Sequence, residues 1–286
     1  MGLNVQRYTN LDSLLSAAAH CREKIFYLAG GTDLMVQLSA GVLPPAVWME
    51  ISDIPELHGI RHKDGQIIIG SGVSHHEIMR SPLLQKYAPA LVCASSNVGG
   101  PQVRSRGTVG GNLGNGSPAA DTVPALYSLG AVVNIISTKG RRSVPVDEFT
   151  LRPRRTVLEP GEIIFSISFP ARENICGLWE AKAQRHSLAI SKINIGFSYV
   201  LEDKNQKEAI FSYLGLAFGS VGPTVLRAKH TEEFLRSAPL TQERIQEAIQ
   251  VVTEDVYPIS DIRSSADYRK AMAKVLLYDA LQIVLN

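Results

Sequence analysis

Two glycine-rich segments constrain the backbone of this chain more than any other part of its sequence. The first, Ala29–Met35, places paired glycines between two apolar runs, Ile25–Leu28 and Leu34–Leu38. The first run predicts a buried strand and the second a helix. A strand that enters a helix through glycines presents backbone N–H groups at the start of that helix, and such groups bind anions such as phosphate.

The second segment, Thr108–Asn112, repeats this design and is followed by Gly114 and Gly116. Glycine suits a phosphate-binding loop because it has no Cβ to block the approach of the backbone, and because it adopts positive φ freely. One Gly-Gly pair most often marks an ordinary turn, whereas two such segments favour a long ligand with a diphosphate at its centre. We therefore expect valine at Gly110 or Gly111 to expel the ligand and leave the fold largely intact.

Apolar periodicity predicts an α+β chain with a change of pattern near residue 175. In the first part we expect further strands and helices at 47–51, 131–136, 163–169, 88–98 and 124–129. In the second part we expect a long antiparallel hairpin and two amphipathic helices, at 193–202, 210–219, 245–252 and 268–283. The apolar positions of these helices indicate a core rather than a cofactor site.

Charge and hydropathy exclude several classes of protein. The formal net charge is +2, and Lys and Arg are scattered along the chain, so nothing indicates a nucleic-acid partner. The apolar runs, such as residues 131–133, are far too short to span a bilayer, and the N-terminal sequence does not resemble a signal peptide. We therefore expect no membrane span and a cytoplasmic location.

No residue pattern indicates a metal site or a catalytic nucleophile. His75, His76 and Glu77 are adjacent, so the two imidazoles point apart, and they are better explained as helix-start or surface residues. Ser117 and Cys93 lie in no recognisable nucleophile motif. We expect neither a metal ligand nor a catalytic side chain in this chain.

The sequence lacks the G-x-G-x-x-G of a Rossmann dinucleotide site and the G-x-x-x-x-G-K-[ST] of a P-loop. The two glycine segments instead resemble the flavin-binding subunit of the molybdenum hydroxylases, in which A-G-G-T-D-L and T-[IV]-G-G-N flank the FAD pyrophosphate. The resemblance continues, in the order of that family, through 99–104, 117–121, 161–164, Lys182 with Arg185, 223–228 and 267–270. It therefore covers nearly the whole chain.

This resemblance implies an α+β fold, with an FAD-binding domain of the vanillyl-alcohol-oxidase or p-cresol-methylhydroxylase type and a C-terminal domain of antiparallel sheet plus helices. We expect the FAD-binding domain to cover residues 1–175, in subdomains of about 1–55 and 56–175, and the C-terminal domain to cover 176–286. The expected FAD-binding residues are Leu28, Ala29, Gly30, Gly31, Thr32, Asp33, Leu34, Met35, Gly99, Gly100, Thr108, Gly110, Gly111, Asn112, Asp121, Ile164, Phe165 and Lys182.

Individual roles follow from the resemblance, and each has a simpler alternative. Asp121 is expected to hydrogen-bond the ribose or the nearby flavin, although Asp beside glycine is commonly a turn residue. Lys182 is expected near the flavin ring, although most lysines are solvated surface residues. Ile164 or Phe165 is expected to form an apolar wall against the isoalloxazine. Asp33 is expected to order its loop rather than to touch phosphate, because like charges repel.

The cysteines assign the other redox centres to partner chains. Cys21, Cys93 and Cys176 are widely separated and form no C-x-x-C, whereas an iron–sulfur cluster needs about four thiolates. The resemblance thus implies a large molybdopterin-binding subunit and a small 2Fe–2S subunit as partners. Electrons from the molybdenum centre would cross the 2Fe–2S clusters to FAD and then reduce NAD or another acceptor.

The resemblance favours xanthine or another purine as the substrate, on the sequence Gly100–Arg104. Carbon monoxide, nicotinate and other aromatic or aldehyde dehydrogenases of the same family remain alternatives. So does a stand-alone flavin oxidase, although the sequence shows no substrate-cap domain and no position for a covalent-flavin histidine. A scaffold that has lost its flavin is a third alternative, which the intact glycines of both segments disfavour.

Overall fold

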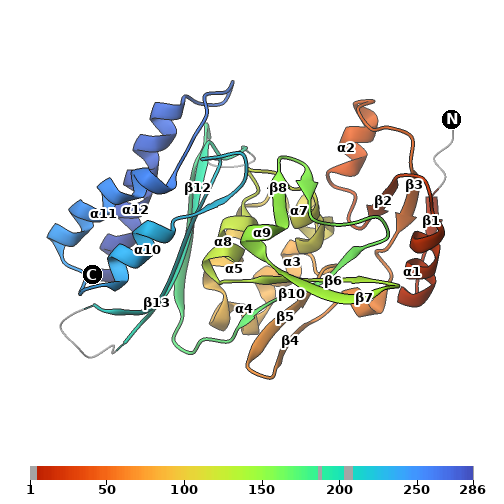
Figure 1. The fold of residues 1–286 in the computed structure, drawn as a ribbon, viewed down its shortest axis with the longest axis horizontal. Helices are drawn as coiled ribbons and strands as arrows, with labels where there is room; N and C mark the ends of the chain where they lie inside the picture. The colour runs from red at the N-terminus through yellow and green to blue at the C-terminus, as the bar shows by residue number, and fades with distance from the viewer. Residues whose placement is uncertain (1–4, 186–188, 203–208, 286) are drawn as a thin grey trace.

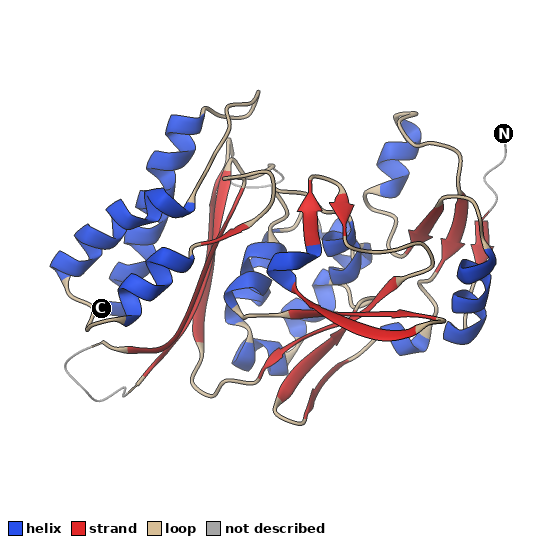
Figure 2. Ribbon diagram, viewed as in Figure 1, coloured by secondary structure: helices blue, strands red, loops and turns tan. Residues whose placement is uncertain are grey.

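Three β-sheets follow one another along the chain, with helices packed around them (Figure 1). The computed structural model describes residues 5–185, 189–202 and 209–285. Helices and strands are mixed within each region, so the predicted α+β class is confirmed. The molecule is elongated, with the first sheet at one end and the last helices at the other (Figure 2).

The first sheet is parallel and small, with strand order β1-β3-β2. Its strands and helices are β1 (Val5–Arg7), α1 (Leu11–His20), β2 (Ile25–Leu28), α2 (Leu34–Ser39) and β3 (Val47–Glu50). Leu11, Leu14, Leu15 and Ala18 recur at helical spacing in α1, and all four are buried against Met49 and Ile54. Helix α2 has no buried residue, so it projects beside the sheet instead of covering it.

The second sheet is antiparallel, with strand order β4-β5-β10-β6-β7. These strands are β4 (Ile60–Lys63), β5 (Gln66–Gly70), β6 (Val132–Ser137), β7 (Gly140–Pro145) and β10 (Ile163–Pro170). The 3₁₀ turn η1 and a group of short helices accompany the sheet: η1 (Pro55–Leu57), α3 (His75–Arg80), α4 (Pro82–Tyr87), α5 (Pro89–Asn97), α6 (Pro101–Arg106), α7 (Val109–Gly114), α8 (Thr122–Ser128) and α9 (Val146–Phe149). A two-stranded hairpin, β8 (Thr150–Arg152) with β9 (Arg155–Thr156), extends from this region.

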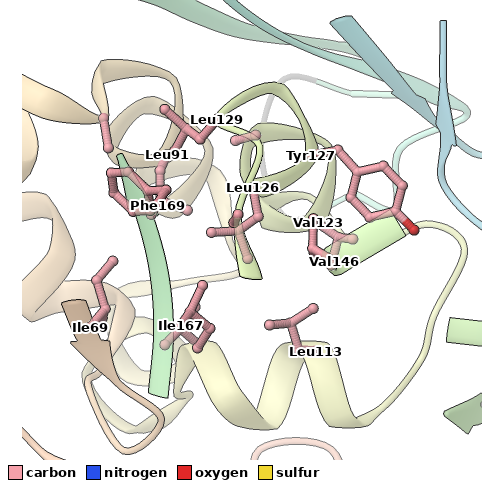
Figure 3. Close-up of a cluster of buried hydrophobic side chains, with 14 of the residues drawn as sticks. Ile69, Leu91, Leu113, Val123, Leu126, Tyr127, Leu129, Val146, Ile167 and Phe169 are labelled. Carbon is pink, nitrogen blue, oxygen red and sulfur yellow. The ribbon is translucent and has the colours of Figure 1, made fainter. Parts of the chain in front are cut away.

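The main core lies between this sheet and its helices (Figure 3). Ile69 of β5 pairs in register with Ile167 of β10, and both side chains are fully buried. Leu113 of α7 and Leu126 of α8 pack onto this apolar face. Apolar and polar residues alternate along β10 after Ile164, and the apolar residues Ile167 and Phe169 are fully buried on one face of the strand.

The third sheet is antiparallel, with strand order β11-β12-β13-β14, and consists of β11 (Cys176–Lys182), β12 (Ile193–Leu201), β13 (Phe211–Gly219) and β14 (Leu226–Arg227). One face is covered by α10 (Lys229–Arg236), α11 (Gln242–Asp255) and α12 (Ala266–Leu285), as Figure 1 shows. The predicted long hairpin is therefore confirmed as β12 and β13, and its predicted turn, 203–207, lies outside the described residues. The predicted helices at 245–252 and 268–283 lie within α11 and α12.

Helix α8 joins the second and third regions, because it packs against β12 and β13 and all seven of its residues are buried. A Cβ on Gly215 would lie 1.9 Å from the carbonyl oxygen of Ser128, and one on Gly196 would lie 2.3 Å from the carbonyl carbon of Pro124. The helix thus contacts the sheet backbone to backbone. The change from the second sheet to the third falls between Pro170 and Cys176, and we propose the domain boundary at 175–176 within that stretch.

Candidate functional site

The first glycine segment has free hydrogen-bond donors. Strand β2 ends at Leu28 and helix α2 begins at Leu34, so Ala29–Asp33 forms the connecting loop. Gly31 has a φ of +73°, which favours glycine. Within the described residues, the backbone N–H groups of Gly30, Gly31, Thr32 and Asp33 donate to no protein acceptor. Four unpaired amides in succession form a concave surface that attracts an anion.

The two glycine segments lie side by side. A Cβ on Gly30 would lie only 1.7 Å from the carbonyl oxygen of Arg106, and one on Gly107 would lie 3.2 Å from Thr32 Oγ1. The backbone before the second segment therefore touches the backbone of the first. Gly30 is required at this contact for its small size rather than for an unusual φ. The predicted juxtaposition of the two segments around one ligand agrees with this geometry.

The second glycine segment differs from the first because its amides are engaged within the protein. The N–H groups of Val109 and Gly110 donate to the carbonyl oxygens of Val73 (3.0 Å) and Ser71 (2.9 Å). The N–H of Gly111 donates to Thr108 Oγ1 at 3.0 Å, and that of Asn112 donates to Thr108 O at 2.9 Å. Thr108 is thus the N-cap of α7. Only Gly111 donates to a side chain, and rotation of the Thr108 hydroxyl would release that N–H.

Gly110 and Gly111 differ in what surrounds them. A Cβ on Gly110 would lie 2.5 Å from the Cβ of Ser71 and 2.7 Å from its carbonyl oxygen, whereas a Cβ on Gly111 would meet only Thr108 Oγ1 at 3.0 Å. Gly110 is therefore part of the packed structure. The expectation that valine at Gly110 leaves the fold intact is wrong, because the β-branched side chain would overlap the backbone of Ser71.

Gly99 and Gly100 form the turn that precedes helix α6. Gly99 has a φ of +47°, and Gly100 is the extended N-cap of the helix. The Arg104 guanidinium reaches back and donates to the Gly99 carbonyl oxygen at 2.7 Å. This arginine therefore holds the turn in place before the chain reaches Gly107, which lies against Thr32.

Asp121 lies at the start of α8 and bonds across to the third sheet. Its Oδ1 accepts hydrogen bonds from Ser191 Oγ at 2.8 Å and from Asn194 Nδ2 at 3.0 Å. Burial raises the pKa of Asp121, and these two hydrogen bonds act in the opposite direction. Its Oδ2 accepts no bond from the described residues and is left for a further donor. Nearby, Thr122 Oγ1 donates to Asn112 Oδ1 at 2.6 Å, which links the second segment to α8.

Ile164 and Phe165 lie on opposite faces of β10. Ile164 is buried in the main core, with its Cδ1 at 3.6 Å from the Cβ position of Gly114 in α7. Phe165 packs with the cluster beneath α1, and its ring lies 4.7 Å from the guanidinium of Arg141. The strand changes register between Ile164 and Ser166. Only Ile164 therefore lies on the side of the second glycine segment.

Lys182 is not brought together with the glycine segments. Its Nζ lies 2.5 Å from Glu180 Oε1, and the hydrogen bond to that carboxylate raises the pKa of Lys182. Trp179 packs in the main core and Leu178 against the C-terminal helices, so β11 alternates between the two sides. This alternation places Lys182 on the same face as Leu178. Its proximity to a flavin ring remains a prediction.

His75 is buried rather than exposed. It lies 2% exposed at the start of α3, where Ser74 and Glu77 form a capping box. Burial lowers the pKa of His75 to about 4, so its imidazole is neutral at pH 7. Among the described residues no cluster of His, Cys, Asp and Glu has the arrangement of a metal site. None of the helices within the described ranges is both long enough and apolar enough to cross a membrane.

Comparison with known protein families shows the family to which the chain belongs. Residues 2–172 match the FAD binding domain in molybdopterin dehydrogenase, and residues 181–284 match the CO dehydrogenase flavoprotein C-terminal domain. The chain belongs to the FAD-binding subunits of the molybdenum hydroxylases. The predicted FAD-binding fold with its C-terminal antiparallel sheet domain is confirmed by these two matches.

Relatives within these FAD-binding subunits align over most of the chain. The xanthine dehydrogenase FAD-binding subunit of Escherichia coli O157:H7 is 33% identical, with 89% of this chain and 88% of that protein covered. The nicotinate dehydrogenase FAD-subunit of Eubacterium barkeri is 32% identical, with 85% and 82% covered. A solved structure of carbon monoxide dehydrogenase from Hydrogenophaga pseudoflava superposes with a TM-score of 0.91 at 27% identity, with 98% of this chain and 96% of that chain covered.

Sequence reasoning about this FAD-binding subunit missed the residues that hold the two segments together. Ser71 accepts from the N–H of Gly110, and the backbone of Arg106 lies against Gly30. Gln37 and Arg154 form a hydrogen-bonded link to the first segment. None of these residues belongs to a glycine motif, and their contacts join elements far apart in the chain. Spacing alone gave no signal for them.

Proposed function

We propose that this chain is the electron-transfer flavoprotein subunit of a molybdenum hydroxylase of the xanthine dehydrogenase type. The observation that carries the proposal is the row of unpaired amides from Gly30 to Asp33, which lies directly against the second glycine segment. A dinucleotide diphosphate is an anion of the size and charge that such a row accommodates. Membership of the FAD-binding subunits identifies that dinucleotide as FAD.

The residues present fit FAD in different ways. The amides of Gly30 to Asp33 would donate to the diphosphate without first breaking a hydrogen bond within the protein. The Oδ2 of Asp121, which accepts no bond from the described residues, would accept from a ribose hydroxyl, while its Oδ1 stays bonded to Ser191 and Asn194. Ile164 would offer an apolar contact beside α7. Lys182 is the weakest member of the predicted set, since its ammonium is already paired with Glu180.

When bound, FAD would supply the redox chemistry, taking electrons that arrive from a partner chain and passing them to NAD or another acceptor. The protein's own residues bind and orient, and we assign no general acid or base to this chain. We propose a molybdopterin-binding chain and a 2Fe–2S chain as partners. Support comes from the cysteines, since Cys21, Cys93 and Cys176 are free thiols that form no cluster site among the described residues.

Xanthine or another purine is our proposal for the substrate, which would bind on a partner chain. The sequence Gly100–Arg104 supports it, and so does the relative that acts as a xanthine dehydrogenase subunit at 33% identity. A nicotinate dehydrogenase subunit is 32% identical. Activity of the purified complex on xanthine and on nicotinate distinguishes the two. Free thiols are typical of a reducing compartment, which supports a cytoplasmic location.

The purified full-length chain is expected to bind one FAD and to prefer it strongly over FMN. FMN carries a single phosphate and no adenosine, so it would satisfy only part of the row of amides. The loss of one or two charge-assisted hydrogen bonds, at about 1.5–3 kcal/mol each, corresponds to binding that is weaker by roughly 10-fold to 10,000-fold. Titration calorimetry with both flavins measures the difference. Equal affinities would contradict a diphosphate site.

Metal analysis tests the assignment of the other redox centres to partner chains. We expect the purified single chain to contain neither iron nor molybdenum, and the complete complex to contain both. The reason is that the three thiols are too few and too dispersed to hold a cluster. Stoichiometric iron in the single chain, measured by plasma mass spectrometry after removal of adventitious metal, would overturn this assignment.

A further inference from the structure

The β8–β9 hairpin carries three arginines close to the two glycine segments. Its turn contains Arg154, which has a φ of +60°, and Arg152 and Arg155 flank this turn. All three arginines are exposed. A hollow of about 780 Å³ lies along residues 151–160. Figure 1 shows β8 next to α7, and α2 lies beyond them toward the first sheet.

Arg154 is bonded to one residue just beyond each glycine segment. Its backbone N–H donates to the carbonyl oxygen of Gly116, just beyond α7, at 2.9 Å. Its Nη1 donates to Gln37 Oε1 on α2 at 2.8 Å. The amide group of Gln37 in turn donates from Nε2 to Asp33 Oδ2. The hairpin therefore spans the two segments, and a continuous chain of hydrogen bonds runs from Arg154 to the first loop.

The Asp33 carboxylate is held by Gln37 at the end of the first glycine loop. Asp33 is the N-cap of α2, and an aspartate there ordinarily accepts hydrogen bonds from the backbone N–H groups of its own loop or first turn. In this structure the Asp33 side chain makes no such capping bond and is bonded to Gln37 instead. The amides beside it, from Gly30 to Asp33, are also unpaired within the described residues.

We propose that Arg154 is a positioning residue that keeps the first glycine loop open for the FAD diphosphate. Arg154 fixes the side-chain amide of Gln37, and Gln37 holds the Asp33 carboxylate away from the amides that the diphosphate needs. Once released, the carboxylate would be able to turn toward the N–H of its own residue and would place a negative charge beside an anionic ligand. This inference rests on the proposed function, since it assumes that FAD binds at this loop.

Apo forms of the full-length chain, prepared by removal of flavin, are titrated with FAD and followed by flavin fluorescence. Arg154→Ala is expected to weaken FAD binding about 10-fold, because the open form of the loop falls to about a tenth of the population. Gln37→Ala is expected to have the same effect. Arg152→Ala is the matched control, since Arg152 is exposed on the same hairpin and makes no bond to α2, and its affinity should stay within twofold of wild type.

The decisive variant removes the competing carboxylate. Asp33→Ala alone is expected to bind FAD at least as tightly as wild type, and the double variant Arg154→Ala with Asp33→Ala should recover to within about threefold of it. A double variant as weak as Arg154→Ala would overturn the inference, as would unchanged affinity in Arg154→Ala. Wild-type protein that binds no FAD would overturn the proposed function itself, so the two failures are distinguished by the wild-type titration.

Discussion

Replacement of Gly30 by alanine is expected to abolish FAD binding in the concentration range where wild-type protein is saturated. The new Cβ would lie 1.7 Å from the Arg106 carbonyl oxygen, so the two glycine segments must separate. Amides displaced by an ångström or more no longer donate well to the diphosphate. The loss of two charge-assisted hydrogen bonds, at about 1.5–3 kcal/mol each, predicts a decrease of about 100-fold or more. Fluorescence titration with FAD measures it.

Val36→Ala provides the control for this variant. Val36 lies on α2, three residues after the last open amide, and is 66% exposed, so its truncation removes no contact that holds the loop. Its FAD affinity and its thermal unfolding midpoint should match those of wild type. A Gly30→Ala protein that binds FAD within threefold of wild type would show that the contact with Arg106 does not position the site.

Gly110→Val is expected to lower the free energy of unfolding by about 3 kcal/mol or more, since overpacking of a filled site costs about 1–3 kcal/mol and a β-branched residue adds to it. The overlap is with the Cβ and carbonyl oxygen of Ser71, on an internal turn that cannot move far. Gly111→Ala should keep the fold, because its Cβ would meet only the Thr108 hydroxyl. Urea denaturation of both variants measures the difference.

Gly114→Ala is the folding control in the same helix. A Cβ there would make an ordinary contact with Ile164 Cδ1 at 3.6 Å, and alanine has a higher helix propensity than glycine. Its urea midpoint should equal or exceed that of wild type. If Gly110→Val unfolds at the wild-type midpoint, then the packing of Gly110 against Ser71 contributes nothing to stability.

Local features of the sequence predicted the fold well. Apolar periodicity gave β2 at Ile25–Leu28 and the long hairpin β12–β13, because a strand or helix with one buried face leaves a regular pattern. The glycine pairs gave both loops of the site. The resemblance to the FAD-binding subunits then predicted the order of the two domains and identified FAD as the ligand. Apolar periodicity carries neither kind of information.

Features that depend on contacts across the chain were not predictable. The amides of Val109 and Gly110 find partners in Val73 and Ser71, more than thirty residues earlier, so a bare loop was expected where an engaged one exists. The resemblance places Lys182 near the flavin ring, but the period of the strand decides which way its side chain faces. Its neighbour Glu180 then takes the ammonium. Side-chain partners of this kind depend on tertiary packing, which sequence spacing does not specify.

The burial of helix α8 means that the FAD-binding part of the chain is not an independent unit. All seven residues from Thr122 to Ser128 are covered, and the glycines of β12 and β13 bring the third sheet into contact with the helix backbone. A chain shortened to end at residue 175 would expose this apolar surface to water and would aggregate rather than carry flavin. We therefore expect a gene for such a protein to tolerate fusion to another gene at either end, but not division at the proposed domain boundary.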